Sequence, residues 1–231
     1  MEHDMQEIQG AIARADLYEL LRHAFAFPTK EFIQALEDAR FEQDLLACVR
    51  EAAFSDSSIS LLKTSFETLK IQSSSKDIFA DMKKEYSRMF LAPGDLRLIY
   101  PYESAFVYVE KNPGKMPSLF FTAIALDVEQ QMRDAGVIPR DARTEPVDSI
   151  FNEFEFMVFL CTQLAIGLQA GDKEQSLLWR SKIQKFGEDH VISWIPRFLE
   201  KVSKETRVEQ YRALASIANI IVQDLNDMDI R

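Results

Sequence analysis

Apolar residues recur every three or four positions along almost the whole chain, and no segment sustains an alternation of apolar and polar residues. A spacing of three and four gathers side chains on one face of an α-helix, whereas a half-buried strand requires alternation. The pattern therefore predicts an all-α fold of about ten helices. The clearest stripes begin at Ile8, Phe32, Phe41, Leu61, Phe79, Ile150 and Val208.

Composition supports one globular bundle. The 231 residues include only 7 Gly and 8 Pro, too few for a chain built of many tight hairpins. Hydrophobic residues make up 47% of the chain and include 17 Phe, which is ample core material. We expect a single all-helical domain over 1–231, in which any division into N-terminal and C-terminal subdomains would fall near 92–118.

Two long irregular segments interrupt the helical pattern. The segment 92–118 carries half of all the prolines, and the second segment covers 137–146. The first is also rich in Tyr, Leu and Ile, and such a loop often packs down to form one wall of a groove. A long connector pinned to the core would look the same, so both interpretations stay open.

The charge balance limits the classes of partner. With 27 basic and 37 acidic residues, the net charge of −10 disfavours nucleic-acid binding and suits a positively charged partner. The N-terminus has no basic-then-apolar signal, and the longest apolar run, Phe156–Cys161, is far shorter than the roughly 20 residues of a bilayer span. We expect a cytoplasmic protein without membrane insertion, and the pair Cys48 and Cys161 fits a reducing compartment.

Catalytic motifs are missing from the sequence. It contains no GxGxxG, P-loop, GxSxG or HExxH pattern. Three scattered His and two distant Cys give no zinc-site spacing, so we expect no metal, no cofactor and no enzymatic activity. Weak nucleotide hydrolysis at Pro101–Ser104 is an alternative, although Ser104 has no base nearby in the sequence.

The segment that leads into the most apolar helix carries a polar stripe. Pro146 suits the first turn of a helix, and either Asp148 or Ser149 can cap it. Asp148, Asn152 and Glu155 are spaced i, i+4 and i+7, which predicts one shared face on an otherwise apolar helix. A polar stripe beside an apolar surface suits a cationic amphipathic peptide.

Several strings in this order resemble the TorD/DmsD/NarJ family of cytoplasmic chaperones. They are Phe90–Pro93, Pro101–Ser104, Glu145–Asp148, Asn152–Met157, His190–Phe198 and Gln210–Leu214, and the resemblance spans roughly residues 10 to 225. One position departs from the family pattern. The usual Glu-Pro-x-Asp-His ends here in Ser149, so a role assigned to that histidine does not carry over.

The resemblance implies an all-helical chaperone for molybdopterin-containing oxidoreductases. Such proteins bind the twin-arginine leader or the N-terminal segment of the catalytic-subunit precursor until the cofactor has been inserted, before export or assembly. It also implies a monomer or a domain-swapped homodimer. A helical scaffold that binds a folded partner is the alternative.

A twin-arginine leader presents two guanidinium groups followed by an apolar stretch, so its binder should offer carboxylates beside an apolar groove. We expect the arginines to meet Asp148, Glu155 and Glu103, with Asp95 and Asn152 as further polar contacts. We expect the apolar stretch to meet Tyr86, Leu91, Tyr100, Pro101, Tyr102 and Phe156.

Overall fold

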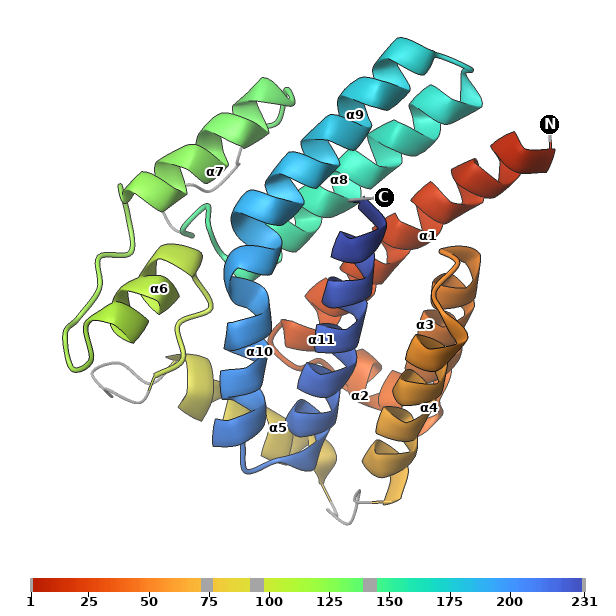
Figure 1. The fold of residues 1–231 in the computed structure, drawn as a ribbon. Helices are drawn as coiled ribbons and strands as arrows, with labels where there is room; N and C mark the ends of the chain where they lie inside the picture. Colours follow the sequence, from red (N-terminus) through yellow and green to blue (C-terminus); the bar gives the residue numbers. More distant parts are fainter. Residues whose placement is uncertain (1, 72–76, 92–97, 139–144, 230–231) are drawn as a thin grey trace.

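The structure, a computed structural model, describes residues 2–71, 77–91, 98–138 and 145–229. Within these ranges the chain forms eleven α-helices and two short π-helices and no β-strand, which confirms the predicted all-α class (Figure 1). The elements are α1 (Glu2–Phe25), α2 (Lys30–Glu37), α3 (Arg40–Glu51), α4 (Asp56–Ile71), α5 (Ile78–Tyr86), η1 (Ser87–Leu91), α6 (Glu103–Lys111), α7 (Ala123–Asp134), α8 (Ile150–Gln169), α9 (Lys173–Phe186), η2 (Gly187–Val191), α10 (Ile192–Glu205) and α11 (Glu209–Asp229).

Helices α1 and α8 lie side by side at the centre of the fold (Figure 1). Tyr18 packs on Phe154 with ring centroids 5.9 Å apart, while Ile8 lines the same cavity as Leu164 and Leu168, so the two helices run antiparallel. Among the described helices, α8 alone is long and apolar enough by length and composition to cross a membrane. However, 56% of its apolar window is buried inside the fold, as expected for a central helix.

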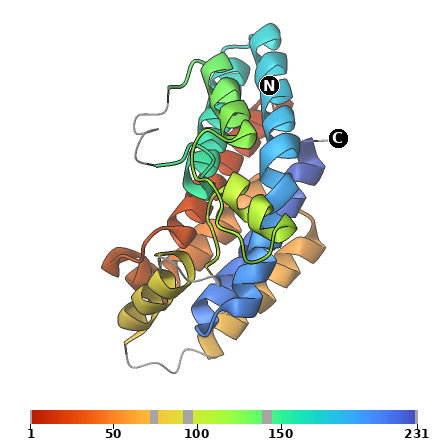
Figure 2. The same cartoon turned by 90° about the vertical axis from the view of Figure 1, so that its left-hand side faces the viewer.

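An aromatic cluster joins the helices that pack around this pair. Phe198 on α10 lies between Phe25 of α1, Phe90 of η1 and Phe106 of α6, with ring centroids 5.9 to 6.3 Å apart, and also contacts Trp194. Figure 1 shows α9, η2 and α10 following one another beside α11, with α4 on the far side of α11. Figure 2 looks onto the side covered by α6 and α7.

Local sequence signals set most helix boundaries. The side chains of Thr29, Ser149 and Asp172 accept hydrogen bonds from backbone N–H groups three residues later and cap α2, α8 and α9, so of the two caps considered for α8 the structure has Ser149. Gly136 follows α7 with φ +80°, a left-handed conformation that favours glycine at a helix end.

The first irregular segment differs from the prediction. Residues Glu103–Lys111 within 92–118 form α6, a nine-residue helix, so this part of the chain is not a simple loop. Helix α7 also starts later than the pattern suggested, at Ala123 behind the cap Thr122. Phe121 just before it is 91% exposed with φ +59°, because the chain turns there instead of continuing a helix.

The aromatic cluster gives a stability prediction. Phe198→Ala should lower the free energy of unfolding by about 3–5 kcal/mol, because it removes a ring that is 1% exposed and leaves a cavity among four aromatic neighbours. Phe121→Ala, a matched change at an exposed ring, should shift it by no more than about 0.5 kcal/mol. Urea unfolding followed by circular dichroism measures both, and equal losses would contradict the assignment of Phe198 to the core.

Candidate functional site

Two of the sequence motifs meet in space. The backbone N–H of Ile150 donates to the carbonyl of Pro101 at 3.0 Å, and the N–H of Glu103 donates to the carbonyl of Asp148 at 2.8 Å. Tyr102 and Ser149 lie opposite one another as an isolated antiparallel bridge. The chain entering α6 is therefore paired with the chain entering α8.

Asp148 stabilises the start of α6 from outside that helix. The cap position of α6 is Tyr102, whose side chain makes no capping hydrogen bond. Instead, Asp148 Oδ2 accepts the N–H of Ser104 at 2.8 Å, which satisfies a donor that the first turn leaves free. Asp148 is fully buried, so its carboxylate serves the fold from inside.

Glu103 holds the π-helical turn before α10. Its Oε2 lies 2.7 Å from His190 Nδ1, and its Oε1 accepts the hydroxyl of Ser193 at 3.1 Å. The other imidazole nitrogen lies 2.9 Å from Asp127 Oδ2 on α7. Burial alone would lower the pKa of His190, but hydrogen bonds to Glu103 and Asp127 and their charges outweigh it, so the pKa is raised above its usual value.

A third acid completes a group that we call the buried acid cluster, namely Glu103, Asp148 and Glu153. Glu153 Oε2 accepts the indole N–H of Trp194 at 2.8 Å, and the residue is fully buried. Burial, followed by the charges of Glu103 and Asp148, holds the pKa of Glu153 well above its ordinary range. The three neighbouring acids therefore repel one another when ionised, and His190, which contacts only Glu103 among them, does not neutralise all three.

Three buried oxygens around this cluster have no hydrogen-bond partner within the described part of the chain. They are Asp148 Oδ1, Glu153 Oε1 and Ser104 Oγ. Unsatisfied buried polar atoms are rare in proteins and mark sites where polarity is kept despite its cost. Together with the raised pKa of Glu153, they single out this junction as the candidate functional site.

The three residues expected to share a face of α8 lie at different depths. Asp148 precedes the helix and is fully buried, Asn152 is half-buried, and Glu155 is exposed. The Asn152 amide donates to the carbonyl of Pro146 at 3.0 Å, so it fixes the entry to α8. The single face inferred from spacing is wrong, because Ser149 caps the helix and Asp148 lies before its first turn.

The aromatic and apolar candidates also divide by exposure. Tyr86 is buried against Phe90, with ring centroids 4.9 Å apart, and Phe156 against Phe186 at 4.7 Å. Tyr100 and Pro101 are buried, Tyr102 is half-buried and Leu91 is 53% exposed. Asp95 lies outside the described residues.

Four residues near the entry to α8 keep part of their surface exposed, and we call them together the acidic face. It comprises Glu145, Tyr102, Asn152 and Glu155. Burial raises the pKa of Glu145 despite a hydrogen bond with Ser149, and burial together with the charges of Glu145 and Asp148 raises the pKa of Tyr102 to about 12. Glu155 is close enough to Arg22 to act on its pKa.

Sequence reasoning missed Glu145, Glu153 and His190 as site residues. The signal for Glu153 was its position between Ile150 and Met157 on the apolar stripe, where a carboxylate is unexpected. Glu145 stood inside a motif already singled out. Nothing local pointed to His190, because its partners come from α6 and α7.

One group of metal-ligating side chains gathers among the described residues. Ligand atoms of Asp127, Asp189 and His190 lie within 4.8 Å of one another. The Gln131 amide nitrogen contacts all three, and Lys185 pairs with Asp189. The carboxylates of Asp127 and Asp189 are therefore already partners of neighbouring side chains, which explains their position without a metal ion.

The described residues thus define an all-helical protein whose candidate site is a buried polar junction between the starts of α6 and α8. The sequence model of the nitrate reductase delta subunit matches residues 56–200, which is more than half of the chain. The chain belongs to this family, the NarJ/TorD-type chaperones of molybdoenzyme maturation, which confirms the resemblance inferred from its motifs. None of the curated proteins matches the chain.

The role of Asp148 can be tested by comparing two substitutions. Asp148→Ala leaves the Ser104 N–H without an acceptor and should lower the free energy of unfolding by about 1–3 kcal/mol. Asp148→Asn keeps an acceptor oxygen and should cost less. Chemical denaturation gives both values, and hydrogen exchange should report faster exchange at the Ser104 amide in the alanine variant only. If the two substitutions lower the free energy of unfolding equally, Asp148 does not cap α6.

The buried acid cluster predicts a pH dependence. A folded-state pKa above the unfolded value means that the native state binds the proton more tightly, so Glu153 weakens stability as pH rises above about 4.3. Glu153→Gln should therefore be more stable than the parent at pH 7–8, by about 1–4 kcal/mol, and the difference should vanish near pH 4. Thermal unfolding across this range tests it, with the exposed Glu155→Gln as a control that should change little at any pH. If the parent unfolds at a higher temperature than Glu153→Gln at pH 8, the raised pKa assigned to Glu153 is wrong.

Proposed function

We propose that this chaperone binds the leader or N-terminal segment of a molybdoenzyme catalytic-subunit precursor and holds it until the cofactor has been inserted. The observation that carries the proposal is the partial exposure of the acidic face near the entry to α8. Glu155 is exposed, and Glu145 and Tyr102 are half-buried. Two carboxylates at this surface suit guanidinium groups, which bind carboxylates in bidentate pairs.

The residues first selected for the site take two different roles in this proposal. Glu155, Asn152 and Tyr102 belong to the surface that meets the arginines, and Glu145 joins them. Asp148 and Glu103 are at most 4% exposed, so they position the two chain segments beneath that surface. Asp95 remains a candidate contact.

An apolar surface lies on the neighbouring elements. Phe27 is 45% exposed and packs on Tyr86 with ring centroids 5.3 Å apart, and Leu91 is exposed at the end of η1. Tyr86 supports Phe27 from beneath and is close enough to Tyr102 and Glu145 for their charges to act on it, whereas Phe156 packs against Phe159 and Phe186. The hydrophobic part of a leader would bury apolar area there at about 25 cal/mol per Å².

Calorimetric titration with a synthetic peptide tests the proposal. The probe carries two adjacent arginines followed by an apolar stretch, and we expect a micromolar Kd, about −8 kcal/mol. Glu145→Gln and Glu155→Gln should each weaken binding about tenfold or more, since a charge-assisted contact contributes about 1.5–3 kcal/mol. A peptide with lysines in place of the arginines should also bind more weakly.

The matched control is Glu67→Gln, an exposed glutamate on α4. It should bind the arginine peptide as the parent does. If Glu145→Gln, Glu155→Gln and Glu67→Gln all retain parental affinity, the acidic face is not the leader site.

A further inference from the structure

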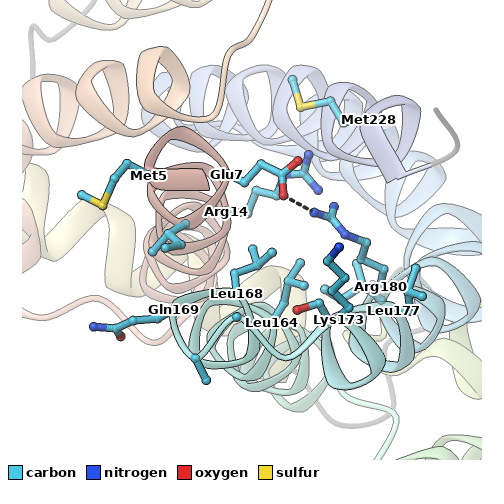
Figure 3. A pocket seen from close by; sticks show the side chains of 15 residues that line it. Met5, Glu7, Arg14, Leu164, Leu168, Gln169, Lys173, Leu177, Arg180 and Met228 are labelled. Carbon is cyan, nitrogen blue, oxygen red and sulfur yellow. Dashed lines mark hydrogen bonds and ion pairs between the residues drawn. The ribbon is translucent and has the colours of Figure 1, made fainter. Parts of the chain in front are cut away.

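A second site candidate lies at the opposite end of the central helix pair. A cavity of about 1080 Å³ opens between α1, α8, α9 and the end of α11 (Figure 3). It is lined by Leu164 and Leu168 near the end of α8, whereas the acidic face surrounds the start of that helix. We call this cavity the helix groove.

The floor of the helix groove is apolar and its rim exposes further apolar side chains. Leu164 and Ile183 are 2% exposed and lie beneath the opening. Met5 on α1 and Leu177 on α9 border it and are 56% and 68% exposed. Large apolar groups exposed around an apolar hollow are typical of an interaction surface.

The groove has a surplus of positive charge although the chain as a whole is acidic. The chain carries a net charge of −10, yet among the described residues that line the groove three are cationic, Arg14, Lys173 and Arg180, and one is acidic, Glu7. Arg180 Nη2 lies 3.0 Å from Glu7 Oε2, and both side chains are more than two-fifths exposed (Figure 3). Lys173 begins α9, where the helix dipole adds further positive potential.

We propose that the helix groove binds an acidic amphipathic helix of a partner polypeptide. Its apolar residues, spaced i, i+3, i+4 and i+7, would contact Leu164, Leu168 and Ile183, and its carboxylates would meet Arg14, Lys173 and Arg180. A trough with α8 as its floor and α1 and α9 as its walls matches the packing of one helix onto others. An arginine-bearing leader would be repelled there, so this site is independent of the proposed leader site.

The test uses a designed, fluorescein-labelled 18-residue helix with leucines in that spacing and glutamates elsewhere. Fluorescence anisotropy should show saturable binding to the parent protein. The same helix with lysines for glutamates, and a scrambled peptide of identical composition, should bind at least tenfold more weakly. Binding of all three peptides with equal affinity would overturn the proposal.

Charge reversal in the groove locates the binding. The double variant Lys173→Glu with Arg180→Glu should bind the acidic helix at least tenfold more weakly than the parent does, and should bind the lysine helix more tightly. Lys63→Glu, at an exposed lysine on α4, is the matched control and should leave both affinities unchanged. Circular dichroism checks that each variant is folded, and loss of an exposed pair such as Arg180–Glu7 should not prevent folding.

The remaining outcomes also decide the matter. Binding of oleate, or self-association of the chain measured by light scattering, without binding of the acidic helix would overturn the proposal. The arginine peptide should bind the double variant as it binds the parent, so failure of the helix groove and failure of the leader site can be told apart.

Discussion

The burial of three carboxylates in one place is the constraint on which the rest of this structure depends. A buried ionised carboxylate costs several kcal/mol unless a partner or a proton compensates it. Here Asp148 meets a backbone amide 44 residues away, and Glu103 meets an imidazole 87 residues away. The first contact forms only when the start of α6 meets the entry to α8, and the second only when the start of α6 meets the π-helical turn. The polar junction therefore couples three distant parts of the chain and fixes what lies above it.

The sequence predicts well whatever local spacing decides. Periodicity identifies the helices. The caps Thr29, Ser149 and Asp172 bind amides three residues away, so local sequence alone is enough to recognise such caps. The acidic site is different. Asp148 and Glu103 were selected as carboxylates that could meet arginine side chains, and their burial accompanies contacts with Ser104 and His190 that no local pattern encodes.

Charge divides the surface into regions suited to different partners. The acidic face and the helix groove lie at opposite ends of α8, and their surplus charges have opposite sign. Because electrostatic complementarity mainly sets specificity and the rate of encounter, opposite charges keep a cationic and an acidic segment from competing for one surface. If the two proposed segments belong to one partner, binding both at once would raise the overall affinity beyond that of either contact alone.

Ser149 and His190 differ in what they contribute to the buried acid cluster. The family pattern usually places a histidine directly after the aspartate, where it could add positive charge beside Asp148. Here Ser149 uses its hydroxyl to accept the N–H of Asn152 and caps α8, so it adds no charge. His190 is the imidazole that reaches the buried acid cluster, and it contacts Glu103 rather than Asp148 or Glu153. The excess negative charge is instead relieved by the raised pKa of Glu153, which lets that carboxyl keep its proton at a pH where an exposed glutamate has lost it.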